Sequence, residues 1–143
     1  MIYLDTSFIA PLFREEAASQ KVADFVSRQA AGTLAISKWT VVEFFSLVSR
    51  DVRMKMLSAA EGRQLVDEFG SVVASSLFVF SPNNYDFEVA GEFVANFATH
   101  LRAPDALQLA VAHNNGVEFV ATLDEGMLSA AKRLKISARR VIR

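Results

Sequence analysis

Four acidic side chains lie where a protein can assemble a site for metal-assisted hydrolysis. Asp5 follows a short apolar segment near the N-terminus, and Asp124 follows another near the C-terminus. Glu43 and Asp105 lie in helical patterns that are apolar on most sides. A lone ionised carboxylate in such surroundings costs several kcal/mol unless it is paired or binds a metal ion. Four carboxylates brought together would repel one another, so their convergence would predict a site for hard cations.

The chemistry that such a site supports is hydrolysis of a phosphodiester. Ligation by oxygen alone suits Mg²⁺ or Mn²⁺, and one or two such ions can acidify a water molecule and stabilise charge on the phosphate. This chemistry requires neither a thiol nor an imidazole, and the chain has no Cys and only two His. The hydroxyls of Thr6, Ser7 and Thr122 are predicted to orient ligands or water beside the acids, although they can equally be turn and cap hydroxyls.

Each acid also has a purely structural interpretation. Asp5 and Asp124 can be N-caps of the helices that follow them. Asp105 and Gln108 have the spacing of a capping box. A capping role for Glu43 would need its helix to begin later than the apolar pattern indicates, and we expect this residue to be buried. The sequence alone leaves both interpretations open for each residue.

The elements that must position these acids predict an α/β fold. Short apolar strands that alternate with helices indicate a small parallel sheet of about five strands, flanked by helices on both faces in a Rossmann-like, three-layer arrangement. Ligands in such folds bind beyond the carboxyl ends of the strands, where Asp5 and Asp124 are expected. The strands are predicted at 2–4, 34–36, 77–80, 118–122 and 140–142, and the main helices at 17–31, 38–55, 58–75, 87–101, 104–114 and 124–134.

Composition limits the class of protein. A chain of 143 residues with 52% hydrophobic residues and a net charge of −1 predicts one folded domain, 1–143, rather than a disordered chain. No segment has the pattern of a signal peptide or the length of a membrane span, so we expect a soluble, cytoplasmic protein. Basic residues gather after Glu125, where there is no further acid. They are either a solvated tail or an edge for a polyanion.

The acidic segments, taken in order, resemble the four motifs of the PIN-domain nucleases. The resemblance rests on the sequences IYLDTS at 2–7, VE at 42–43, RAPDALQLA at 102–110 and ATLD at 121–124. It covers essentially the whole chain, and the length of the chain resembles the VapC-type toxins of bacterial toxin–antitoxin pairs.

The resemblance implies a metal-dependent endoribonuclease that acts on structured RNA such as tRNA or rRNA. It implies that Asp5, Glu43, Asp105 and Asp124 form an acidic pocket for Mg²⁺ or Mn²⁺. It also implies a homodimer and a cognate antitoxin that fills the active-site groove. The chain departs from the pattern at Glu125, where similar proteins often have a basic residue. Arg102 and the basic C-terminal segment are candidates to supply the missing positive charge to an RNA substrate.

Other classes fit less well. A haloacid-dehalogenase-like phosphatase needs an acid two residues after Asp5, where this chain has Ser7, and a dinucleotide-binding domain needs a glycine-rich first turn. The remaining alternative is a catalytically silent PIN-like module that binds RNA or protein. Aromatic residues at helical spacing, Phe44, Phe45, Phe93 and Phe97, are expected in the core, although some could line an interface.

Overall fold

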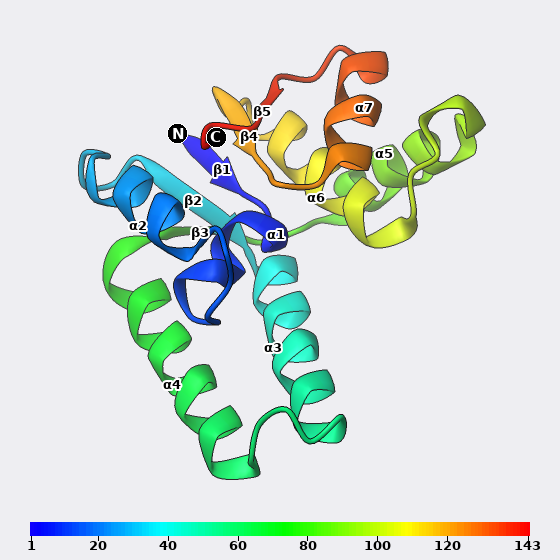
Figure 1. Ribbon diagram of the computed structural model, residues 1–143. Coiled ribbons are helices and arrows are strands. Elements are labelled where there is room, and N and C mark those ends of the chain that lie inside the picture. Colours follow the sequence, from blue (N-terminus) through cyan, green and yellow to red (C-terminus); the bar gives the residue numbers. More distant parts are fainter.

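A five-stranded parallel sheet forms the centre of the molecule (Figure 1). The computed structural model describes residues 1–143. The strands lie in the order β3-β2-β1-β4-β5, and each neighbouring pair is parallel. This confirms the predicted sheet and places the carboxyl ends of all its strands at one edge. The bounds are β1 Ile2–Leu4, β2 Leu34–Ser37, β3 Phe78–Phe80, β4 Phe119–Ala121 and β5 Ala138–Arg139.

Helices cover both faces of this sheet. The α-helices are α1 Thr6–Ile9, α2 Ser19–Ser27, α3 Lys38–Arg53, α4 Ala59–Ser76, α5 Asn84–Ala95, α6 Ala103–Asn114 and α7 Glu125–Leu134. Two 3₁₀ turns, η1 Ala10–Leu12 and η2 Phe97–Thr99, follow α1 and α5. No helix is both long enough and apolar enough to cross a membrane.

Alternation of side chains along the central strand divides the core in two. Ile2 and Leu4 point to one face and pack with residues of α1 to α4. Tyr3, between them, points to the other face and packs with residues of α5 to α7. A strand whose successive side chains are all buried requires cover on both faces. The three-layer arrangement predicted from the sequence is therefore confirmed.

Helices α3 and α4 pack against each other and extend together beyond the sheet (Figure 1). Ser37 caps α3 and Ser58 caps α4, and each forms a capping box with the residue three positions later. The predicted capping box of Ser58 is thus confirmed. Gly62 lies where the two helices come close, because an added Cβ would stand 2.7 Å from Val52 Cγ2.

Several predicted boundaries and burials are wrong. The last strand is at 138–139 rather than 140–142. The helix predicted at 87–101 starts earlier than expected, because Asn83 caps it in a capping box, and it ends at Ala95 before a 3₁₀ turn. Phe44 is fully buried, but Phe45 and Phe97 are 39% and 83% exposed. Apolar residues at helical spacing therefore include an exposed set as well as a core set.

Candidate active site

Two neighbouring strands bring the first and last acidic motifs together. β1 and β4 pair in parallel with Leu4 opposite Ala121, so the residues that follow them, Asp5 and Thr122, lie side by side. The Asp5 amide donates to the Ala121 carbonyl at 3.2 Å, which continues the strand pairing by one residue. The predicted meeting of these segments at the carboxyl edge of the sheet is seen in the fold.

Asp5 is buried and fully hydrogen-bonded. Its Oδ1 accepts from the backbone amide of Phe8 at 2.9 Å and from the Ser7 hydroxyl at 2.8 Å, and its Oδ2 accepts from the Thr122 hydroxyl at 2.6 Å. The capping role is therefore present, and it coexists with contacts to two of the three predicted hydroxyls. Burial raises the pKa of Asp5 to about 7, although these hydrogen bonds act in the opposite direction.

Glu43 lies in the second turn of α3 and is partly rather than fully buried. Its helix is not buried on nearly all sides as predicted, because Val42 is 54% exposed. Thr6, the third predicted hydroxyl, donates to Glu43 Oε1 at 3.0 Å. The capping interpretation is excluded for Glu43, because Thr40 is the residue that completes the box with Ser37. Burial raises the pKa of Glu43 above its ordinary value, and its hydrogen bonds partly offset the rise.

Gln108 also contacts Glu43, and the sequence did not reveal this role. The predicted capping box of Asp105 with Gln108 is wrong, because α6 begins at Ala103 and Arg102 is its N-cap, without a side-chain hydrogen bond. Gln108 instead points across the molecule and donates from Nε2 to Glu43 Oε1. The sequence offered only one signal of this role, a polar side chain on a largely buried helix. The partner of Gln108, Glu43, is 65 residues away and could not be inferred.

Asp105 and Asp124 complete the set of predicted acids. Asp105 lies in the first turn of α6, and Asp124 caps α7 by accepting from the Met127 amide at 2.6 Å. Burial, and after it the negative charges of Asp124 and Glu43, raise the pKa of Asp105 to about 6. The charge of Asp105 in turn raises the pKa of Asp5. The four carboxylates are therefore close enough to act on one another electrostatically.

The donor set suits a hard divalent cation, although it does not form a ready-made cage. No three acidic, histidine or cysteine side chains converge tightly enough to constitute a metal site on their own. Carboxylates whose mutual repulsion raises their pKa values gain from a cation placed among them, and oxygen ligands suit Mg²⁺ or Mn²⁺. Glu43 Oε2 and Asp124 Oδ2 accept no hydrogen bond from the protein and are available as ligands.

Positive charge lies at two points near the acids. Arg102, exposed at the N-terminus of α6, lowers the pKa of Asp105 and so acts electrostatically on it. Arg140 directly follows β5 and binds Glu125 Oε1 through Nη1 at 2.6 Å. Glu125, which stands where similar proteins often have a basic residue, is thus paired with Arg140 of the basic C-terminal segment.

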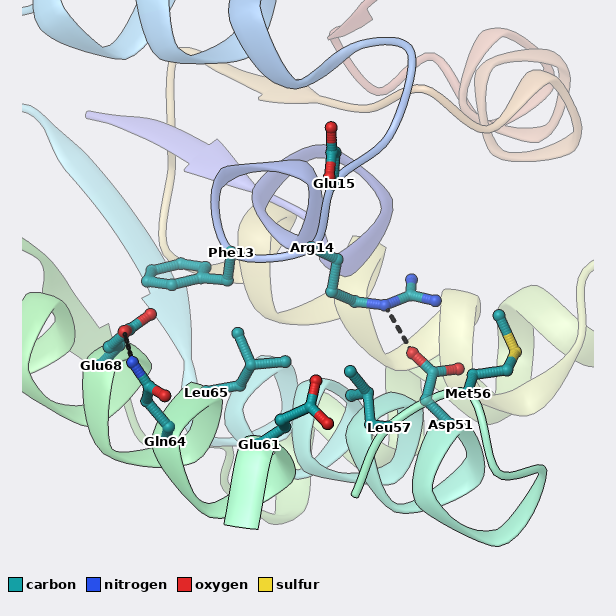
Figure 2. A pocket seen from close by; sticks show the side chains of 10 residues that line it. All are labelled: Phe13, Arg14, Glu15, Asp51, Met56, Leu57, Glu61, Gln64, Leu65 and Glu68. Atoms are coloured by element: carbon teal, nitrogen blue, oxygen red, sulfur yellow. Dashed lines mark hydrogen bonds and ion pairs between the residues drawn. The ribbon is translucent and has the colours of Figure 1, made fainter. Parts of the chain in front are cut away.

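The surface has hollows both at and away from the acids. A hollow of about 290 Å³ beside Glu43 is lined also by Thr6, Trp39 and Pro104. A different hollow, of about 390 Å³, lies between the segment after η1 and the facing ends of α3 and α4. Figure 2 shows the side chains that line it. There Arg14 donates from Nε to Asp51 Oδ2 at 2.9 Å. None of the four predicted acids lines this second hollow.

Comparison with solved structures shows where this fold occurs. The chain is similar to Mycobacterium tuberculosis VapC20, described as a toxin that cleaves the sarcin–ricin loop, with a TM-score of 0.75, 19% identity, and coverage of 91% of this chain and 95% of that one. It is similar to FitAcB of Neisseria gonorrhoeae, with a TM-score of 0.73, 21% identity, and coverage of 96% of each chain. It is also similar to VapBC-1 of nontypeable Haemophilus influenzae, with a TM-score of 0.70, 16% identity, and coverage of 97% of each chain.

Sequence comparison identifies the family. Curated protein sequences give no significant match. The sequence profile described as the PIN domain, however, matches residues 2–133, which include all four predicted acids. Together with the parallel five-stranded sheet, this match shows that the chain belongs to the PIN domain family.

Proposed function

We propose that this protein is a metal-dependent endoribonuclease and the toxin of a toxin–antitoxin pair. The observation that carries the proposal is the gathering of the four acids at the carboxyl edge of the sheet, where Asp5 and Thr122 follow paired strands and the charges of Asp124 and Glu43 raise the pKa of Asp105. A metal cation among the four carboxylates would reduce their mutual repulsion. It would also allow a negatively charged phosphodiester to bind beside them. The proposed substrate is structured RNA, either tRNA or rRNA, and VapC20 supports the second of these as a relative described as cleaving an rRNA loop.

The roles of the acids follow from their hydrogen bonds. A bound Mg²⁺ or Mn²⁺ would supply positive charge for the phosphate and make a nearby water more acidic. Asp5 is held in one orientation by Ser7, Thr122 and the Phe8 amide, so it would present fixed oxygens. Glu43 and Asp124 each keep one oxygen without a protein partner. These oxygens would hold the cation, or would accept a proton from the attacking water.

Arg102 is the proposed contact to substrate. It is exposed, and its charge acts on Asp105, so a phosphate bound to Arg102 would lie beside the acids. A surface arginine that binds phosphate contributes mainly to affinity and makes that affinity depend on salt. Arg102→Gln should therefore raise the KM for RNA more than it lowers kcat.

Two protein partners belong to the proposal. A similar structure from Klebsiella pneumoniae, with a TM-score of 0.63 and 15% identity, is described as a toxin–antitoxin complex, which supports an antitoxin that covers the acidic groove of this chain. The second proposed partner is another copy of the chain, which would give a homodimer. The exposed apolar side chains described above are consistent with either contact.

The alternative is a PIN domain that binds RNA or protein without cutting it. One observation favours it: no three acidic side chains form a tight metal site. Against it stand all four acids and the hydrogen bonds that orient two of them. The variant Asp5→Asn distinguishes the two functions. A nuclease would lose cleavage in this variant, whereas a silent module has no cleavage to lose and would keep its binding.

The deciding experiment is cleavage of total tRNA and rRNA fragments in Mg²⁺ or Mn²⁺ and in EDTA. Wild type should give discrete products that disappear in EDTA and in Asp5→Asn. Asp67→Asn is the matched control, because Asp67 is an exposed acid on α4, and it should cut like wild type. Products that persist in Asp5→Asn or in EDTA would contradict the mechanism. RNA binding without cleavage in any metal would favour the silent module.

A further inference from the structure

A chain of hydrogen bonds, partly buried at Glu43 and buried at its other end, connects Glu43 to the central strand of the sheet. Gln108 stands in the middle of it, only 1% exposed. Its Nε2 donates to Glu43 Oε1 and, at 2.9 Å, to the Thr6 hydroxyl. Its Oε1 accepts from the Tyr3 hydroxyl and, at 3.1 Å, from the Thr40 hydroxyl. Every donor and acceptor of the amide is therefore used.

The orientation of this amide is fixed from both sides. The reverse orientation would set Gln108 Oε1 against a carboxylate oxygen of Glu43, and two acceptors cannot share a hydrogen bond. The hydroxyl of Tyr3, which is fully buried, is itself held 2.8 Å from Ser37 Oγ. Since Tyr3 belongs to β1 and Ser37 ends β2, the amide is anchored to the rigid part of the fold.

This arrangement determines which part of Glu43 remains available. Both donors, Gln108 and Thr6, reach the same oxygen, Oε1. Oε2 accepts no hydrogen bond from the protein, and the carboxylate borders the hollow of about 290 Å³. A side chain in a helix would otherwise sample several rotamers. Two donors on one oxygen restrict Glu43 to orientations that leave the other oxygen free for a ligand.

We propose that Gln108, anchored by Tyr3 and Thr40, is a positioning residue that orients Glu43 for the reaction. It touches neither substrate nor cation and acts only through Glu43. The inference rests on the proposed function for its effect on cleavage, but its effect on cation binding can be measured independently. Partners that orient ligating side chains typically change metal affinity or activity by about 10- to 100-fold when removed.

The test compares Gln108→Leu with Asn114→Leu. Asn114 lies on the same helix, and its amide also donates to a buried carboxylate, Asp86 Oδ1, at 2.8 Å. Both variants therefore remove an amide donor to a carboxylate, but Gln108 makes four hydrogen bonds and Asn114 one, so Gln108→Leu should lose more stability. Gln108→Leu should lower kcat by about 10- to 100-fold with little change in the KM for RNA. It should also weaken Mn²⁺ binding, measured by calorimetry, whereas Asn114→Leu should keep both properties.

A second variant keeps the test valid if Gln108→Leu does not fold. Tyr3→Phe removes one hydroxyl and retains the ring, so it should change kcat and Mn²⁺ affinity in the same direction but less. Equal effects of the Gln108 and Asn114 variants on both readouts would overturn the inference. If wild type cuts no RNA, the proposed function fails, and the Mn²⁺ comparison alone then decides the role of Gln108.

Discussion

Burial and hydrogen bonding act on Asp5 in opposite directions, and burial has the larger effect. Its pKa lies near 7 in the folded protein, against 3.8 for an ordinary aspartate. Between these pH values the metal-free folded state holds a proton that the unfolded state has released. The stability of the metal-free protein must therefore fall as the pH rises through this window. Asp105, with a pKa of about 6, adds to the same trend.

Asp5→Asn should reduce this pH dependence. In EDTA, we expect the free energy of unfolding of wild type to fall from about pH 5 to about pH 8 by on the order of 1–3 kcal/mol, and that of Asp5→Asn to fall less. Urea unfolding at several pH values measures both. Asp67→Asn serves as the control and should follow wild type. Wild-type stability that stayed level or rose over this range would show that Asp5 remains charged without metal.

The hydroxyl of Thr122 gives a second prediction at a single residue. It donates to Asp5 Oδ2 at 2.6 Å and accepts from the Asp124 amide at 3.0 Å, so it links two of the acids. Thr122→Val keeps the shape of the side chain and removes both bonds. We expect about a tenfold loss of kcat. Thr33→Val, whose hydroxyl bonds only to the Ala30 carbonyl, should leave kcat unchanged, and an equal loss in both would argue against the link.

At the scale of the element, the sequence predicted correctly the features that depend only on neighbouring residues, such as helix caps. Asp5 and Asp124 cap the helices that follow them, and a cap needs only neighbours within three residues. The partners of Gln108 could not be predicted, because the contact to Glu43 crosses 65 residues and depends on how α3 and α6 pack. The strand at 138–139 was misplaced because two residues carry no pattern, and only pairing with β4 defines it.

An ion pair of Arg14 links the segment after η1 to the last turns of α3. Its Nε donates to Asp51 Oδ2 at 2.9 Å (Figure 2). Asp51 is only 4% exposed. Arg14→Ala would leave this carboxylate with the weaker contact to Arg50 at 3.5 Å. We expect a loss of about 1–3 kcal/mol in the free energy of unfolding.

Denaturant unfolding of two variants tests this contribution. Glu16→Ala removes only an ion pair of 3.7 Å between Arg14 and an exposed glutamate, so it should change stability by less than about 0.5 kcal/mol. Equal losses in Arg14→Ala and Glu16→Ala would mean that the buried contact to Asp51 contributes nothing of its own. Cleavage, which does not involve this end of α3, should be unaffected once the variant is folded.

At the scale of the whole molecule, a largely apolar hollow is bordered by α5, η2 and the start of α6. It has a volume of about 630 Å³ and is lined by Trp39, Phe87, Val94, Phe97 and other small or apolar residues. Phe87 and Phe97 are 59% and 83% exposed there. Contiguous exposed apolar surface marks interaction sites in soluble proteins. Trp39 and Pro104 belong also to the hollow beside Glu43, so a partner here would lie next to the acids.

Mutations at this apolar surface can test whether it forms the interface of the proposed homodimer. An interface between copies needs a buried apolar centre, and Phe97 is the most exposed large apolar side chain of the protein. Wild type should elute as a dimer at micromolar concentration, and Phe97→Asp should shift it toward monomer, because dimerisation would bury the new charge. Met54→Asp, at the far end of α3, introduces the same charge on an exposed methionine and should leave the dimer intact. A monomeric wild type would contradict the dimer itself, whereas a dimer that tolerates Phe97→Asp would place its interface on another face.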